Sequence, residues 1–264
     1  MIVVDDGSPE PVEPVVAKAN GRLHVTCLRQ ENAGPAKARN RGAAAAQGQY
    51  LAFTDDDCRP EPTWLERLIA PLKDRPDALV GGQTVNLLTD NVYAEASQDL
   101  VSFLYDYALR HGRGLDFFTS NNMACRKDRF AALGGFDETF PLAAAEDRDF
   151  GLRWKEQGWP LIHAPGAVVG HLHALSLARF WRQQANYGRG ARHLRVRMAD
   201  RDGRKVPFEG LRFYARMAHF PFREGRPNAA LRTCLLGLSQ VAMVAGFADE
   251  RFRRRRGNHV ATKP

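Results

Sequence analysis

The feature that most constrains this chain is a short apolar run that ends in three consecutive carboxylates. Residues 48–60 read GQYLAFTDDDCRP, in which Tyr50–Phe53 form the run and Asp55, Asp56 and Asp57 follow it. Such a run is typical of a strand buried on both faces. Adjacent carboxylates repel one another, and a divalent cation that prefers hard oxygen ligands, Mg²⁺ or Mn²⁺, would compensate them. The segment predicts a cation site at a strand end; a solvated acidic turn is the alternative, and the three acids alone do not decide.

The composition is that of an ordinary globular protein with an excess of positive charge. Of 264 residues, 44% are hydrophobic and 26% are charged, which argues against wholesale disorder and allows one large domain, or one domain with an appendage. The formal net charge is +8, and much of the excess lies in residues 189–204 and 251–256. Such segments suit nucleic acid, anionic lipid or phosphorylated substrates, and charge alone does not choose among these partners.

The cysteines and the first residues bear on the cellular compartment. The four cysteines lie far apart without a CxxC spacing, so we expect neither a zinc site nor a disulfide framework, and a reducing cytoplasm fits. The first residues, MIVVD, carry no basic segment and no long apolar stretch, so we expect no signal peptide.

Strands and helices alternate before the acidic segment. An apolar strand at residues 2–4 stops at Asp5 and Asp6, and polar groups after such a strand lie at the carboxyl edge of a parallel sheet, where open α/β sheets bind ligands. A plain turn is the alternative. We expect a second strand over residues 23–28, then a helix that begins at Pro35 and whose N-terminus favours anions.

After the acids, the sequence predicts a capped helix. Residues 63–66, Thr-Trp-Leu-Glu, form a capping box, and the helix that follows should face inward with Leu65, Leu68, Ile69 and Leu72. Strand, helix, strand, acids and helix in this order indicate an α/β fold.

Two ordered sets of motifs resemble the inverting family-2 glycosyltransferases, which have the fold called GT-A. The first set is VVDDGS followed by NAGPAKARNRGAAAAQGQYLAFTDDDCRP. The second is SNNMACR at residues 120–126, LGGFDE at 133–138, EDRD at 146–149 and a segment from Pro165 to His171. Each motif is weak alone, but the ordered set, which covers residues 2–195, is strong. The resemblance implies a Rossmann-like mixed sheet flanked by helices, with a C-terminal helical appendage, that uses a nucleotide sugar.

The resemblance also implies roles for individual residues. It implies Asp147 as the general base and Asp57 as a metal ligand. It implies a further metal ligand at His171, for which a structural histidine is the alternative. The remaining roles are nucleotide-sugar binding by Asp5, Asp6, Arg39, Asp55 and Asp56, and acceptor binding by Asn121, Asn122 and Glu146.

The chemistry of sugar transfer agrees with these roles. A departing nucleoside diphosphate needs its charge neutralised, which a carboxylate-held cation does as a Lewis acid, and a base must take the proton of the acceptor hydroxyl. Glu146 and Asp147 also begin a predicted helix, so these acids could merely favour the helix dipole. Asn121 and Asn122 follow a strand-like segment over residues 116–120, and they could bond sugar hydroxyls or hold a turn.

The segment after the motifs reads as a basic helix that begins at Leu175. Residues 179–184 are RFWRQQ, not the QxxRW motif that the processive synthases of this family carry, so we expect non-processive transfer. A solvated basic face is the plain interpretation of the arginines.

The C-terminal region is expected to be helical and basic. A turn-rich linker at residues 202–207 precedes helices over 208–219 and 228–247, so we divide the chain into a GT-A domain, residues 1–200, and an appendage, residues 201–264. The most apolar stretch of the second helix is shorter than the roughly 20 residues a membrane span needs. We expect it to pack on the domain or lie on a membrane surface, with the basic tail beside anionic headgroups; a disordered tail is the alternative.

One departure from the family concerns the N-terminus. Relatives usually carry one more strand and helix before the segment that matches VVDDGS, so we expect either a start further upstream or a shortened protein.

These features predict a metal-dependent, inverting glycosyltransferase of polysaccharide biosynthesis in the cell envelope. We expect it in the cytoplasm or peripherally on the inner face of the membrane, with a saccharide, a lipid-linked saccharide or a small molecule as acceptor. The alternatives are a shortened, inactive nucleotide-sugar-binding or membrane-associated protein, and a nucleotidyltransferase, for which a glycine-rich phosphate loop is missing. A nucleic-acid-binding protein ranks last, because the basic segments are poor in interleaved aromatic residues.

Overall fold

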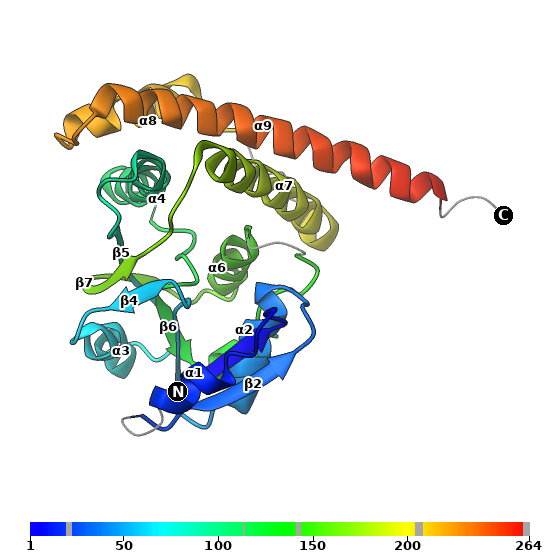
Figure 1. The fold of residues 1–264 in the computed structure, drawn as a ribbon. Helices are drawn as coiled ribbons and strands as arrows, with labels where there is room; N and C mark the ends of the chain where they lie inside the picture. Colours follow the sequence, from blue (N-terminus) through cyan, green and yellow to red (C-terminus); the bar gives the residue numbers. More distant parts are fainter. Residues whose placement is uncertain (20–22, 113, 141–143, 204–207, 261–264) are drawn as a thin grey trace. The chain divides into compact units, whose positions relative to one another are not determined.

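The computed structural model describes residues 1–19, 23–112, 114–140, 144–203 and 208–260, and the chain divides into two compact units (Figure 1). Unit 1 takes in residues 1–54, 63–82 and 116–167, and unit 2 takes in residues 55–62, 83–115 and 168–264. Each unit therefore combines segments that are far apart in the sequence. Strands β5 (Leu79–Asn86) and β7 (Leu161–His171) each run from one unit into the other.

Unit 1 holds a two-stranded parallel sheet and part of a five-stranded sheet. β1 (Ile2–Asp6) pairs with β2 (Thr26–Gln30), so that Asp5 lies opposite Arg29. β3 (Tyr50–Phe53) pairs antiparallel with β6 (Met123–Arg126), which pairs with the first half of β5 in a sheet of order β3-β6-β5-β7-β4. The helices of the unit are α1 (Glu13–Ala19), α2 (Pro35–Ala45), α3 (Trp64–Asp74), α5 (Lys127–Ala132) and α6 (Glu146–Glu156).

An aromatic cluster fixes α6 within unit 1. The ring of Phe150 lies 4.7 Å from Phe136 and 5.4 Å from Phe130, and Trp154 continues the cluster at 5.5 Å from Phe150. Gly151 lets the helix approach the chain before β6, because a Cβ there would lie 2.4 Å from the carbonyl oxygen of Asp116. Close packing at both places sets the position of the N-terminus of α6.

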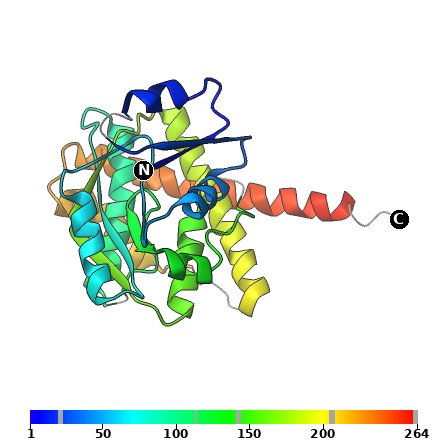
Figure 2. The same ribbon diagram turned by 90° about the horizontal axis from the view of Figure 1, so that it is seen from below.

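Unit 2 consists of β4 (Cys58–Pro60), the second halves of β5 and β7, and the helices α4 (Val92–Arg110), α7 (Leu177–Asp202), α8 (Leu211–Arg223) and α9 (Ala229–Val260). Helices α7 and α9 pack closely through glycines. A Cβ at Gly188 would lie 1.9 Å from the carbonyl oxygen of Met243, and one at Gly246 would lie 1.8 Å from that of Ala185. Beyond this packing the last turns of α9 run clear of the other helices of the unit (Figures 1 and 2).

Helix α9 is longer than the sequence predicts, and the length argument against a membrane span is wrong. Ala229–Arg251 is long and apolar enough to cross a bilayer by length and composition, with a mean hydropathy of 1.4 in its most apolar window. One such helix is weak evidence, because core helices of soluble proteins meet the same criteria. Arg232, which is 3% exposed, pairs with Asp99 and Glu95 of α4, and these buried ion pairs favour packing of α9 against α4.

The predicted mixed sheet with flanking helices and C-terminal helices is confirmed, and several local expectations are wrong. The segment 116–120 is not a strand; the strand that follows it is β6, which begins at Met123. The second strand is β2, shifted from residues 23–28 to Thr26–Gln30. Residues 204–207 of the expected linker lie outside the described residues, and α7 continues through Asp202.

Helix α3 begins where the sequence predicts, but its capping box and its buried face differ. Thr63 lies at φ −96° and ψ 5°, where its side chain makes no capping hydrogen bond. Leu65 is 52% exposed, and the buried stripe is Trp64, Leu68 and Leu72. These three residues share one face at a spacing of four, and the indole of Trp64 donates to Asn122 Oδ1 at 2.8 Å, which turns Leu65 to solvent.

We predict that Gly188→Ala destabilises the protein whereas Gly237→Ala, also within a helix of unit 2, does not. The new Cβ at position 188 meets backbone of α9, and overpacking of this kind costs about 1–3 kcal/mol or more. No heavy atom lies within 4 Å of the Cβ position at Gly237, so alanine there should add about 0.5–1 kcal/mol of stability. Urea unfolding of both variants measures the difference, and equal midpoints would contradict it.

Candidate active site

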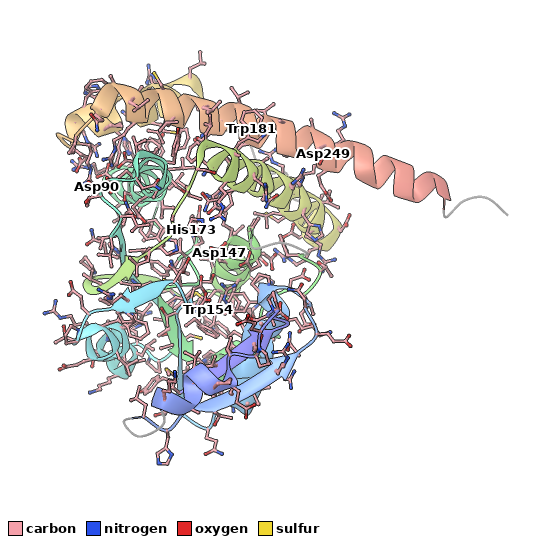
Figure 3. All side chains as sticks on the ribbon, in the orientation of Figure 1. Asp90, Asp147, Trp154, His173, Trp181 and Asp249 are labelled. Atoms are coloured by element: carbon pink, nitrogen blue, oxygen red, sulfur yellow. The ribbon has the colours of Figure 1, made fainter. Side chains whose placement is uncertain are left out.

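Two acidic residues begin helix α6 in unit 1 (Figure 3 labels Asp147). Ala145, the residue before the helix, has φ 72°, an uncommon backbone conformation for a residue with a Cβ, and it sets the entry of the chain into α6. Glu146 is 3% exposed, whereas Asp147 is only partly buried and its Oδ1 accepts a hydrogen bond from the Arg148 N–H at 2.8 Å. The acid that remains accessible is therefore Asp147.

Arg39 of α2 is the cation that faces this pair. Its Nη1 lies 2.9 Å from Glu146 Oε1, and its guanidinium stands over the ring of Phe136. The other oxygen, Oε2, is buried and has no hydrogen-bond partner among the described residues. Sequence analysis placed Arg39 near the donor; in the structure its close partner is an acid of the predicted catalytic pair.

The electrostatics of the pair favour protonation. Burial and the neighbouring charge of Asp147 raise the pKa of Glu146 to about 7, although Arg39 opposes the shift. Burial also raises the pKa of Asp147. Two adjacent carboxyls with raised pKa values are the arrangement expected of groups that exchange protons near neutral pH.

Asp149, the third acid of this helix turn, has a structural environment. It is fully buried, and its Oδ2 lies 2.6 Å from Arg153 Nε. Arg153 also donates to the carbonyl oxygens of Leu133 and Gly135, so its guanidinium joins α6 to the chain after α5.

Asp5 and Asp6, predicted to hold the nucleotide, bond protein groups at the end of β1. Asp5 accepts from the Ser8 N–H at 2.8 Å and from Arg29 at 2.7 Å, and these two partners lower its pKa. Asp6 accepts from the N–H groups of Ala33 and Gly34, which precede α2. Asp6 thus holds β1 against the segment that leads into α2, whereas Asp5 holds it against β2, and the contact of both acids with a nucleotide stays a prediction.

Asn121 and Asn122, predicted to bind the acceptor, are both buried in unit 1. Asn122 accepts from the indole of Trp64 and donates to the carbonyl of Ala167 at 3.0 Å. Acceptor binding by Asn122 would have to break these bonds, and the roles of both residues stay predictions.

A second group of candidate residues lies in unit 2, at the turn before β4. Asp55 and Asp57 are partly buried and Asp56 is exposed. Asp57 Oδ2 lies 3.0 Å from His171 Nε2 and 3.3 Å from His173 Nδ1, and the two imidazoles stack with centroids 5.3 Å apart. Hydrogen bonds from His171 and then His173 hold the pKa of Asp57 well below its ordinary value. The predicted ligands Asp57 and His171 are therefore together.

The register of two strands explains this convergence. β4 pairs antiparallel with the end of β7, and Cys58 lies opposite His171. The Leu172 N–H donates to the Asp57 carbonyl at 2.8 Å, which continues the pairing by one step on each side. Residues at positions i and i+2 of an extended segment share a face, so His173 follows His171.

Sequence reasoning missed His173 and Cys58 at this site. The ligating atoms of Asp57, Cys58 and His171 all lie within 4.8 Å of one another, a separation that a bound metal ion could bridge. The sequence held one usable signal, the His-x-His spacing of residues 171 and 173. No residue pattern indicates that Cys58 would face His171.

A pocket of about 890 Å³ lies elsewhere in unit 1, beside α2. Its lining includes Lys37 and Arg41, and none of the predicted site residues is among the described residues that line it. We therefore do not place the acid pair in this pocket.

Comparison of the sequence with family models matches residues 1–134 to "Glycosyl transferase family 2". Among curated proteins, a pre-mycofactocin glycosyltransferase of Mycobacterium tuberculosis (strain CDC 1551 / Oshkosh) is 35% identical over 207 residues, which cover 76% of this chain and 43% of that protein. A chondroitin synthase of Escherichia coli is 27% identical over 206 residues, covering 65% of this chain and 30% of that protein. The chain thus spans less than half the length of these relatives.

Two solved structures share the fold. A mannosyltransferase from Pyrobaculum calidifontis, in complex with GDP-Man and Mn²⁺, aligns with a TM-score of 0.58 at 19% identity, covering 99% of this chain and 71% of that one. GalNAc-T7 with UDP, GalNAc and Mn²⁺ aligns with a TM-score of 0.52 at 15% identity, covering 88% of this chain and 49% of that one. At these identities the likeness establishes the fold alone.

We predict that Glu146→Gln reduces the loss of folding stability that wild type shows as the pH rises from 4.5 to about 7. Glu146 has a pKa of about 7 in the folded protein, whereas its ordinary value is 4.5. The folded protein therefore binds the proton of Glu146 more tightly than the unfolded chain does. The stability that this proton contributes is fully present below pH 4.5 and is lost as the pH rises through 7. The raised pKa of Asp147 also makes stability decrease as the pH rises, so the variant should reduce this loss of stability without abolishing it. Urea unfolding across this range measures it, with Glu66→Gln on the exposed face of α3 as control. A Glu146→Gln curve parallel to wild type would contradict the assignment.

Proposed function

This chain belongs to glycosyl transferase family 2, and we propose that it moves a sugar from a nucleotide-diphosphate sugar to an acceptor hydroxyl with inversion at the anomeric carbon. The observation that carries this proposal is the acid pair of α6. It combines raised pKa values, an accessible Asp147 and a buried Glu146 oxygen without a hydrogen-bond partner among the described residues. Solved structures of the same fold that contain UDP or GDP-Man support the class of donor.

In the proposed reaction Asp147 takes the proton of the acceptor hydroxyl. The acceptor oxygen then attacks the anomeric carbon, and the bond from that carbon to the diphosphate oxygen breaks, so the electron pair leaves with the nucleoside diphosphate. Attack from the side opposite the leaving group inverts the configuration. General-base assistance of this kind typically contributes about 10²–10⁴-fold to the rate.

Glu146 and Arg39 support that base. Arg39 holds one oxygen of Glu146, and the other oxygen is buried and has no hydrogen-bond partner among the described residues. Asp149 is excluded as the base because it is buried and paired with Arg153. We assign Glu146 to positioning the acceptor and Asp147 to proton transfer.

A divalent cation fits the Asp57 site, where a nitrogen of His171 lies 3.0 Å and one of His173 lies 3.3 Å from Asp57 Oδ2. Such a cation supplies Lewis-acid stabilisation of the diphosphate leaving group. Imidazole nitrogens suit Mn²⁺ better than Mg²⁺, which prefers oxygen ligands throughout. We therefore propose Asp57, His171 and His173 as cation ligands and expect Mn²⁺ to support more activity than Mg²⁺.

The class of acceptor and binding to a membrane surface are two further parts of this proposal. We propose single transfers to a saccharide or lipid-linked acceptor in the cytoplasm. Val241 and Val244 of α9 are 59% and 69% exposed, so an apolar strip of this helix faces outward. This strip and the basic residues that follow it favour peripheral binding to an anionic membrane surface, which salt-sensitive binding to anionic vesicles would test.

We predict that Asp147→Asn lowers the rate of sugar transfer by about 10²–10⁴-fold, because it removes the base and keeps the shape of the side chain. Donor affinity should stay near wild type. Turnover with nucleotide-sugar donors and equilibrium binding of the nucleotide measure the two effects, with Asp128→Asn at an exposed acid of unit 1 as control. A largely active Asp147→Asn, or a deeper loss in Glu146→Gln with binding intact, would assign the base to another residue.

We predict that transfer requires a divalent cation and that Asp57→Ala abolishes it without unfolding the protein. The side chain of Asp57 is 33% exposed, so losing its bonds to His171 and His173 should lower stability without unfolding the protein. Activity after chelation and after Mn²⁺ or Mg²⁺ is restored measures the requirement, and circular dichroism reports the fold. Asp90→Ala, at an exposed acid before α4, is the control. Full activity in excess chelator would refute the requirement.

A further inference from the structure

A pocket of about 660 Å³ lies in unit 2 where the end of α4 meets α8. Its volume is within the range of roughly 300–1,000 Å³ that is usual for small-molecule sites. The described residues that line it are Arg110, His111, Ala215, Arg216, His219 and Arg223. No carboxylate is among these described lining residues, so the pocket offers positive charge and hydrogen-bond donors.

Packing of α8 against α4 holds the pocket in place. The rings of Phe213 and Phe220 lie 5.1 and 5.7 Å from the ring of Phe103 in α4, and Met217 is buried in the same cluster. Residues spaced by three and four share one face of a helix, so these side chains form the buried face of α8. The residues of α8 that line the pocket lie on another face and are exposed.

One carboxylate partly neutralises two of the three arginines. Asp106 Oδ1 lies 2.5 Å from Arg110 Nε, and its Oδ2 lies 2.6 Å from Arg223 Nη2. Arg223 also lies 3.0 Å from an oxygen of Glu224. Asp106 therefore fixes two guanidiniums of the lining beside each other.

Arg216 is held by neutral groups instead. Nδ1 of His111 lies 2.8 Å from the Tyr107 carbonyl oxygen, so we assign the proton to Nδ1, and Nε2 accepts a hydrogen bond from Arg216. The His111 ring stacks on Tyr107 at 4.4 Å, and the Arg216 guanidinium lies 5.8 Å from the Tyr107 ring. Arg216 forms no ion pair with a carboxylate in the part of the chain that the structure describes. Its position is therefore fixed while its charge is not compensated.

An exposed apolar stripe runs along α8 beside the basic residues. Leu211 and Phe222 are 88% and 51% exposed, Tyr214 is also exposed, and their spacing places the three on one face. The basic stripe next to it consists of Arg212, Arg216, His219 and Arg223. Helices that lie at a membrane surface have this pattern, in which apolar side chains enter the lipid and arginines reach its phosphates.

We propose that this basic pocket binds the phosphate group of an anionic membrane lipid, with the apolar stripe of α8 against the acyl chains. The planar fork of a guanidinium matches phosphate oxygens in bidentate hydrogen bonds, and the lipid supplies the negative charge that Arg216 lacks. The apolar stripe favours a lipid over a soluble phosphate or a nucleic acid, because neither of these would cover Leu211. The membrane contact proposed above lies on α9; this site is a separate contact on α8, and it rests on no step of sugar transfer.

Cosedimentation of the full chain with vesicles tests the site. Phosphatidylcholine vesicles that contain phosphatidic acid should bind wild type, and phosphatidylcholine alone should not. Arg216→Gln should weaken binding by about 10–100-fold, the effect of losing hydrogen bonds to a charged group. Arg212→Gln removes the same charge from the same stripe but lies outside the pocket lining, and it should weaken binding about fivefold, the general effect of one surface arginine. Equal losses in the two variants, or no binding to phosphatidic acid, would overturn the proposal.

Arg216→Lys separates the guanidinium fork from its charge. Lysine keeps the charge and loses the fork, so its affinity for the vesicles should fall between those of wild type and Arg216→Gln. Wild-type affinity in Arg216→Lys would show that general attraction is sufficient and would overturn a specific site. Circular dichroism should give wild-type unfolding for all three variants, since these side chains are exposed.

Two ligands identify the source of the phosphate. Leu211→Ser should weaken vesicle binding and leave the affinity for glycerol 3-phosphate, measured by calorimetry, at the wild-type value. If Leu211→Ser binds vesicles as wild type does, the ligand is a soluble phosphate and the lipid assignment is wrong. A short single-stranded RNA that binds wild type more tightly than the vesicles do, and loses affinity in Arg216→Gln, would assign the pocket to nucleic acid.

Val244→Ser separates this site from the contact proposed for α9. If Val244→Ser weakens vesicle binding while Arg216→Gln and Leu211→Ser do not, α9 carries the membrane contact and the pocket proposal fails. Sugar transfer to a soluble acceptor should be unchanged in Arg216→Gln, because the described lining includes none of the residues proposed for catalysis or cation binding. If no donor supports transfer, the proposed function fails, and vesicle binding still decides whether the pocket takes a lipid phosphate.

Discussion

The cost of burying a carboxylate is the constraint on which both units of this protein depend. A buried charge without a partner costs several kcal/mol, and removing one partner of a buried pair typically costs about 3–5 kcal/mol. Three buried acids form ion pairs with arginines: Asp5 with Arg29, Asp149 with Arg153, and Asp99 with Arg232. The pair of Asp5 and Arg29 joins β1 to β2, and the pair of Asp99 and Arg232 links α4 to α9 across 133 positions of sequence. The compensation of acids is therefore also what holds distant segments together.

The acid pair of α6 departs from this pattern in a way that suits chemistry. Arg39 pairs with Glu146, and Asp147 adds a second negative charge on the next residue. Compensation is incomplete, so protonation supplies the rest and both pKa values rise. Asp149, by contrast, is buried and pairs with Arg153 of the same helix, so it is not open to an acceptor. Incomplete compensation of the pair is consistent with the proton-transfer role that we propose for Asp147.

The sequence predicted the strands and helices that depend on short-range residue patterns. The strand before the acids, the helix that begins at Pro35, and the start of α6 at Glu146 depend on residues within a few positions, and the structure has all three. The partners at the site come from much further away: Glu146 lies 107 positions from Arg39, and His171 and His173 lie 114 and 116 positions from Asp57. A one-residue change of register between β4 and β7 would turn Cys58 away from His171, and no local pattern specifies that register. The assembly of each unit from separated segments follows from the same long-range pairing.

The carboxylate of Asp57 is compensated differently from the buried acids, and the difference suits the cation site that we propose there. Two imidazoles, not an arginine, face the carboxylate, and imidazole nitrogens can hold either a proton or a metal ion. An arginine would compensate Asp57 permanently and would repel a cation. His171 and His173 hydrogen-bond the carboxylate, and the same nitrogens could act as the metal ligands that we propose. The backbone pairing of β4 with β7 places Cys58 opposite His171 by itself, so the cation binding that we propose there would cost less ordering entropy.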